Sequence, residues 1–193
     1  MVTTAGVASF AGPNQGVNLP SNVFGNYGTA VSIEMWVTTT SDNRRYSRLF
    51  QFGPATGTDA NTIGVYNDWY GTGKIYMMVG QRYYGSNFPF AAQTLHVVLT
   101  MSVGNYVRLY VNGSLAITAP TALTVIPTPT FFHVGYWSYG DDYLVGSVRD
   151  FRIWGGALSA DEVVANFFGG AGWSHFVAIL YSRIHSFSLV SDL

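Results

Sequence analysis

The chain has 193 residues, a length that fits one β-sandwich domain with a sizeable core. Charged residues make up only 10% of it, the net charge is −1 and the one lysine is Lys74, so the clustered cations that nucleic-acid binding requires are missing. Because the chain has no cysteine, disulfide bonds, thiolate metal sites and a cysteine nucleophile are excluded.

Short segments with strand patterns, separated by turn residues, fill the first half of the chain. The strongest is 31–37, where apolar and polar side chains alternate and Glu34 falls on the face opposite the apolar residues. The regular return of such segments indicates a sandwich of antiparallel strands rather than alternating strands and helices. Strands are predicted at residues 7–10, 17–19, 31–37, 49–52, 63–66, 74–79 and 82–84.

Residues 95–117 predict a meander of three strands. Apolar and polar residues alternate in 95–102 and again in 107–111. The intervening Asn112-Gly113 dipeptide is typical of a type I′ turn, since both central residues of that turn need a positive φ. A meander cannot stand alone in water, so we expect a second sheet to cover its apolar face.

The last third of the chain predicts a crossover, two strands and one helix. Three prolines between residues 119 and 130 exclude a central strand there and favour a segment along a sheet edge. Strands are predicted at 131–136 and 145–154. Ser159 and Glu162 have the spacing of a capping box, which predicts a helix that ends near residue 168, before the glycine pair at 169 and 170.

The domain boundaries follow from these elements. Residues 1–172 are expected to form one sandwich, and the tail 173–193 is expected to add a further strand to the same domain. The N-terminal residues 1–10 lack the basic region and long apolar run of a signal peptide. No segment reaches the roughly 18 apolar residues of a membrane span.

Three sequence blocks together resemble a known family. Residues 31–37 (VSIEMWV), 96–113 (HV…LYVNG) and 146–163 (GSVRDFRIW…ALSADEV) occur in the order and spacing of laminin-G-like domains in the concanavalin A-like lectin/glucanase superfamily. The resemblance implies an all-β, two-sheet antiparallel jelly roll over about residues 7–168. Arg149 and Leu95 stand where family members often have an acidic and an aromatic residue, so ligand-binding roles are not carried over to those positions.

The carboxylates indicate a protein that is not an enzyme. Glycoside hydrolases need two carboxyl groups on one face, about 5 Å apart when the mechanism is retaining, whereas Glu34 has only Ser32 and Trp36 as same-face neighbours. We predict that Glu34 is structural and lies within about 4 Å of an arginine, with Arg152 as the expected partner. The histidines are too dispersed for a metal motif, and no G-x-S-x-G pattern occurs.

Calcium is the one candidate cofactor. Many relatives hold this ion with loop carboxylates and carbonyls, and oxygen-bearing loop residues of the right kind are present. Their role as turn formers explains the same residues without a metal. The candidate ligands are Asp59, Asn61, Asp68, Asp141 and Asp142.

Aromatic residues in loops are the best ligand candidates. Their flat apolar faces and polar tips suit sugar rings, and the same side chains are common at protein interfaces, so both uses stay open. The candidates are Tyr66, Trp69, Tyr70, Tyr83, Tyr84, Tyr136, Trp137, Tyr139 and Tyr143.

Two functions follow from a nearly uncharged, tyrosine-rich surface. The first is a non-catalytic, lectin-like module that binds a neutral glycan through its aromatic loops, with calcium as a candidate aid. The alternative is a structural or assembly protein of a virion, filament or cell surface that uses the jelly roll for homo-oligomeric contacts. Either function places the protein outside the cell, at the cell surface or in a virion, with carbohydrate or protein subunits as partners and no nucleic acid.

Overall fold

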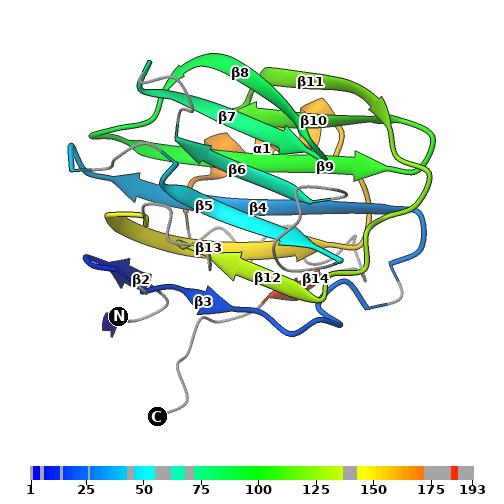
Figure 1. Ribbon diagram of the computed structural model, residues 1–193. Coiled ribbons are helices and arrows are strands. Elements are labelled where there is room, and N and C mark those ends of the chain that lie inside the picture. The colour runs from blue at the N-terminus through cyan, green and yellow to red at the C-terminus, as the bar shows by residue number, and fades with distance from the viewer. Residues whose placement is uncertain are drawn as a thin grey trace.

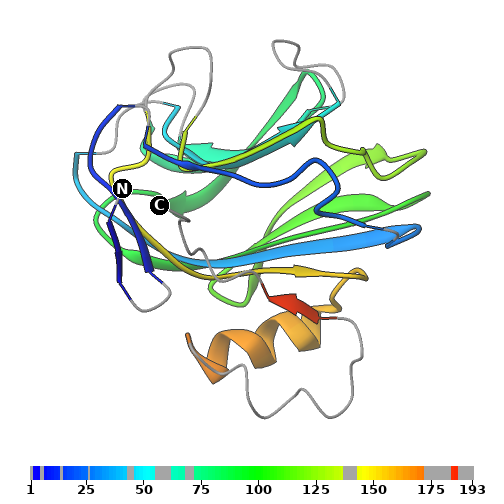
Figure 2. The same cartoon turned by 90° about the horizontal axis from the view of Figure 1, so that it is seen from below.

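The computed structural model confirms an all-β sandwich of two antiparallel sheets (Figures 1 and 2). In the described part of the chain, one short helix lies outside the sandwich, against one of the two sheets. The structure describes residues 2–4, 7–13, 15–25, 27–42, 46–54, 62–67, 72–136, 143–171 and 184–186.

The first sheet has eight strands and contains the predicted meander. The meander strands β9, β10 and β11 lie at one side of this sheet, and the first and last strands of the chain lie at the other. In the order β1-β2-β13-β4-β9-β10-β11, the strands are β1 (Val2–Thr4), β2 (Val7–Phe10), β13 (Gly146–Trp154), β4 (Ala30–Thr39), β9 (Thr94–Ser102), β10 (Tyr106–Val111) and β11 (Ser114–Ala122), and β14 (Ile184–Ser186) also pairs with β13.

The second sheet has six strands and is built mainly from the first half of the chain. Among the residues that the structure describes, one strand of this sheet comes from the second half: β12, which lies between β3 and β5 (Figure 1). In the order β3-β12-β5-β6-β7-β8, the strands are β3 (Val17–Asn18), β12 (Phe131–Val134), β5 (Arg48–Gly53), β6 (Ile63–Asn67), β7 (Lys74–Val79) and β8 (Arg82–Pro89).

The core lies between the two sheets, where the alternating apolar side chains of both meet. Ile33 and Met35 of β4 are fully buried, as the pattern of residues 31–37 predicts. Aromatic rings join the layers: Phe132 of the six-stranded sheet contacts Phe151 of the eight-stranded sheet edge to face, at 5.9 Å between ring centroids. Such pairs add to the stabilisation that burial alone provides.

Strand β11 is longer than the sequence predicts. It runs from Ser114 to Ala122 and includes Pro120, whereas the predicted strand ended at residue 117. β11 is the last strand in its sheet. A proline is tolerated at a sheet edge because its missing N–H costs no hydrogen bond when it faces away from the neighbouring strand.

Helix α1 (Ala160–Gly169) begins at the predicted capping box. The Ser159 side chain accepts from the Glu162 backbone N–H, and the Glu162 side chain accepts from the Ser159 backbone N–H. The helix covers the outer face of the eight-stranded sheet (Figure 2). There Val163 packs on Val98 and Tyr110.

Glu34 lies beneath this helix and is fully buried. Its Oε1 atom accepts from His96 Nε2 at 2.8 Å and lies 3.5 Å from Arg152 Nη1, within the distance predicted for an arginine. Its Oε2 atom accepts from Trp154 Nε1 at 2.7 Å and from Asn166 Nδ2 at 3.3 Å. The carboxylate therefore connects three strands and the helix.

Candidate functional site

The candidate site is the outer face of the six-stranded sheet, on the side away from helix α1. Alternate residues of β5, β6, β7 and β12 point outward here because their neighbours, such as Phe50, Val65 and Met77, fill the core. We call this surface the outer aromatic face. It is made of Asn18, Tyr46, Arg48, Gln51, Tyr66, Tyr76, Tyr83, Phe131, His133 and Tyr136.

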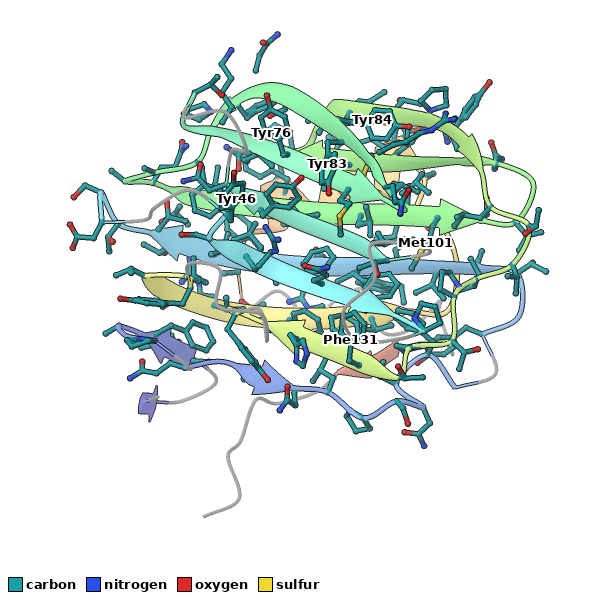
Figure 3. The ribbon with its side chains drawn as sticks, in the orientation of Figure 1. Tyr46, Tyr76, Tyr83, Tyr84, Met101 and Phe131 are labelled. Carbon is teal, nitrogen blue, oxygen red and sulfur yellow. The ribbon has the colours of Figure 1, made fainter. Side chains whose placement is uncertain are left out.

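Tyrosines form one half of this face. Tyr66 of β6 is fully buried, and its ring stacks on Tyr76 of β7 at 6.3 Å and meets Tyr83 of β8 edge to face at 6.4 Å. Tyr76 and Tyr83 are half-buried. Figure 3 shows them with Tyr46 on the outward side of the sheet. Their rings provide a partly exposed flat surface on a rigid support.

Arg48 lies at the centre of the face and is 4% exposed. Its guanidinium carbon lies 4.4 Å from the centre of the Tyr66 ring, a cation–π contact. Its Nε atom donates to Gln51 Oε1 at 2.8 Å, and its Nη1 atom donates to the Tyr46 carbonyl at 3.2 Å. Tyr46, whose carbonyl accepts this bond, has a φ of +63°. Arg48 thus holds the tyrosines and Gln51 in one arrangement.

His133 forms the other half of the face with Asn18. Its Nδ1 atom lies 2.6 Å from Asn18 Oδ1, which also accepts from the Tyr136 hydroxyl at 2.5 Å. The imidazole stacks on Phe131 at 5.2 Å and contacts the Tyr136 ring at 4.6 Å. Burial lowers the pKa of His133 below its usual value of about 6.5.

The lowered pKa of His133 predicts a stability that falls in acid. Histidine in the unfolded chain takes up its proton near pH 6.5, while the folded chain binds it only at lower pH. The stability due to neutral His133 is therefore complete above about pH 6.5 and is lost as the pH falls through that value toward the folded pKa. We expect urea unfolding at about pH 7.5 and about pH 5 to show a larger loss for the natural chain than for His133→Gln. Equal losses would contradict this.

The structure sorts the predicted aromatic residues into three groups. Tyr66, Tyr83 and Tyr136 belong to the outer aromatic face. Tyr84 packs toward the core, and Tyr143 is half-buried and makes none of the contacts described for this face. Trp69, Tyr70, Trp137 and Tyr139 lie outside the described residues. Tyr66, Tyr83 and Tyr84 lie in strands β6 and β8 and not in loops, in agreement with the strands predicted at 63–66 and 82–84.

Sequence patterns did not indicate several residues of the outer aromatic face. Tyr76 alternates with the apolar Ile75 and Met77, a signal that could have placed it on the outer side. Arg48 and Gln51 are three residues apart, so simple alternation would place them on opposite sides of β5. They share a side because the pairing with β6 shifts its register between Arg48 and Phe50. His133 gave no signal, since its neighbours in sequence are apolar on both sides.

The five predicted calcium ligands, Asp59, Asn61, Asp68, Asp141 and Asp142, all lie outside the described residues. Within the described ranges there is no group of three or more His, Cys, Asp or Glu side chains that could hold a metal. Calcium binding therefore stays a prediction. Among the helices that the structure describes, none is long and apolar enough to cross a membrane.

Solved structures of glycan-processing proteins resemble this fold. Trypanosoma rangeli sialidase in complex with the inhibitor DANA matches with a TM-score of 0.67 and 21% identity, over 82% of this chain and 27% of the sialidase chain. Domain 4 of AbnA, an extracellular GH43 arabinanase from Geobacillus stearothermophilus, in complex with arabinotriose, matches with a TM-score of 0.55 and 17% identity, over 82% and 80% of the two chains. This chain thus spans about a quarter of the sialidase and most of the arabinanase domain.

A heptameric SAP-like pentraxin from Limulus polyphemus also matches, with a TM-score of 0.51 and 18% identity over 70% of each chain. At these identities the likeness to solved structures shows the fold alone. No protein with a curated description matches the sequence.

These comparisons correct the predicted function. From the sequence we expected a non-catalytic, lectin-like module for a neutral glycan, with an assembly protein as the alternative. The similar solved chains instead include an enzyme, the sialidase, which has also been solved in complex with sialic acid, a sugar that carries a carboxylate. The function predicted from the sequence is contradicted by this finding, while the expectation that the chain itself is not an enzyme stays a prediction.

Membership of a family rests on a separate finding, a match of residues 10–164 to a family model. That range includes the three sequence blocks and both sheets apart from β1, β14 and all but the last residue of β2. The chain belongs to the concanavalin A-like lectin/glucanases superfamily, as the sequence resemblance predicted.

Proposed function

We propose that this chain is a carbohydrate-contacting domain of a glycan-processing protein and that it binds an acidic saccharide on the outer aromatic face. The observation that carries the proposal is the arrangement of half-buried Tyr76 and Tyr83 around a buried, oriented arginine, Arg48. A pyranose ring can lie on such tyrosine rings, while a guanidinium favours a carboxylate.

The charges of the sheet agree with an acidic ligand. The six strands of this sheet carry Arg48, Lys74 and Arg82 and no aspartate or glutamate. Lys74 points to the outer side, as Tyr76 does, because Ile75 between them is buried in the core. A saccharide carboxylate would therefore meet no carboxylate from these strands.

The role proposed for these residues is contact with the saccharide. Most glycoside hydrolases cleave with two carboxyl groups on either side of the bond, whereas sialidases use a tyrosine nucleophile. The carboxylates among the described residues are Glu34, Asp42, Asp150, Asp161 and Glu162, and all of them lie outside the six strands. The described residues of the outer aromatic face provide hydrogen bonds, aromatic rings for stacking and positive charge.

The likeness to sialidase and to the arabinanase domain supports a saccharide as the ligand class. We therefore expect isothermal titration calorimetry to detect binding of sialyllactose, with lactose weaker by about tenfold, which corresponds to about 1.4 kcal/mol. Arabinotriose is the second neutral comparison. Equal affinity for sialyllactose and lactose would refute the acidic ligand, and the absence of binding by all three would refute the proposed function.

Tyr83→Ala tests the position of the site. Removing this half-buried ring is expected to weaken saccharide binding about tenfold without a comparable change in stability. Tyr106→Ala is the matched control, because Tyr106 is 47% exposed on β10 of the other sheet. If both variants weaken binding equally, or neither does, the saccharide does not bind on the outer aromatic face.

A further inference from the structure

Gln51 and His133 are adjacent in the six-stranded sheet. They are direct partners across β5 and β12, so their side chains lie side by side on the outer aromatic face. Gln51 is fully buried and His133 is 8% exposed. The Nε2 atoms of both residues are buried and have no hydrogen-bond partner among the described residues.

The orientation of the Gln51 amide is fixed by its neighbour. Arg48 Nε donates to Gln51 Oε1 at 2.8 Å. An arginine has only donors, so the amide atom that it contacts must be the oxygen. The other end of the amide, Nε2, is consequently an N–H₂ group whose hydrogens are free to donate within the described part of the face.

The tautomer of His133 follows from the orientation of the Asn18 amide. With Asn18 Oδ1 accepting from the Tyr136 hydroxyl and lying 2.6 Å from His133 Nδ1, Nδ1 is the ring nitrogen that carries the proton. Nε2 then has a lone pair and can only accept. Gly16 leaves room for this arrangement, because a Cβ atom at residue 16 would lie 2.0 Å from Tyr136 Cδ1.

One donor and one acceptor, both held in place, thus come from directly paired residues of β5 and β12 on the outer aromatic face. A hydroxyl group matches this pair, because it can donate its proton to His133 Nε2 while its oxygen accepts from Gln51 Nε2. We propose that Gln51 and His133 form a subsite that recognises one hydroxyl group of the bound saccharide. This inference rests on the proposed function and adds to it the residues that select among saccharides.

The energetics favour such a ligand group. A buried polar atom without a hydrogen-bond partner is unfavourable, and the paired residues Gln51 and His133 carry one such atom each. A hydroxyl that bonds to both removes this cost on binding. A saccharide without that hydroxyl leaves both atoms unsatisfied, and sites of this kind reject the analogue strongly for that reason. The subsite is therefore expected to act on specificity more than on general affinity for sugars.

Two substitutions test the subsite without removing its neighbours. Gln51→Glu keeps the oxygen that accepts from Arg48 but replaces the donating Nε2 by an oxygen. His133→Asn keeps a group near Nδ1 for Asn18 but lacks Nε2. We expect each to weaken binding of sialyllactose about tenfold or more, whereas His133→Gln, which places an amide oxygen near the Nε2 position, retains affinity within about threefold. Thermal melts identify any variant that fails to fold.

Nitrogen NMR of the natural chain gives a readout that needs no variant. Free His133 is expected as the Nδ1–H tautomer, and sialyllactose is expected to shift its Nε2 resonance in the direction of an accepted hydrogen bond. If sialyllactose binds and Tyr83→Ala weakens it, but the Nε2 resonance and the Gln51→Glu affinity are unchanged, the subsite is refuted and the proposed function stands. If sialyllactose does not bind the natural chain, both are refuted.

Discussion

Replacing Glu34 by alanine is expected to lower the free energy of unfolding by about 3–5 kcal/mol, because it leaves buried cationic and polar groups without their acceptor. Arg152 lies 3.5 Å from the carboxylate, and His96, Trp154 and Asn166 all donate to it. Urea unfolding followed by tryptophan fluorescence measures the loss of stability. Trp154 is one of the donors to Glu34, so its fluorescence reports on this contact.

Two controls separate the buried carboxylate from carboxylates in general. Glu34→Gln keeps one oxygen acceptor, so we expect a smaller loss of about 1–3 kcal/mol. Asp161→Asn changes an exposed carboxylate in the first turn of α1 and should alter stability by less than about 1 kcal/mol. A Glu34→Ala variant as stable as the natural chain would show that the carboxylate does not hold the helix, β9 and β13 to β4.

The second large effect is expected for Gly146→Ala, at about 3 kcal/mol or more. Gly146 begins β13 between two neighbouring strands, opposite Phe10 of β2 and Thr39 of β4. Its φ is +152°, and a Cβ atom would lie 2.0 Å from the Thr38 carbonyl oxygen. The clash is with backbone, so a side-chain rotation cannot relieve it.

Gly104→Ala is the matched control for the backbone strain alone. Gly104 also has a positive φ, +73°, but its Cβ position has no other atom within 4 Å. We expect this variant to lose about 1 kcal/mol, the cost of a non-glycine residue in the left-handed region. Chemical denaturation measures the loss of stability of both variants. Similar losses would mean that β13 shifts to accommodate the Cβ atom of Gly146→Ala.

Local patterns were sufficient to predict most of the strands and the helix. In 31–37 the alternation identified both the core residues and the opposite face of Glu34, because strand periodicity depends only on neighbours in sequence. The capping box at Ser159 and Glu162 marked the start of α1 for a similar reason. The bulge of β13 gave no such signal. It places Asp150 at a φ of +51° and shifts the pairing with β4 between Arg149 and Arg152.

The outer aromatic face was only partly predictable. Tyr66 and Tyr83 were among the candidates because tyrosines cluster along the chain, but their place on strands depends on pairing with β7. The pair of Gln51 and His133 joins residues from opposite halves of the chain. The distance between Gln51 and His133 in the sequence does not indicate that they are neighbours. They become neighbours because the chain crosses from one sheet to the other and places β12 beside β5.

The sequence by itself determined the class of fold, the family, the positions of most strands and the cap of the helix, because each depends on periodicity or on a few adjacent residues. Only the tertiary structure decided which outward side chains meet: Arg48 with Gln51 and Tyr66, and His133 with Asn18. The physical reason is that strand order and register set these contacts, and both result from packing the two sheets on one core.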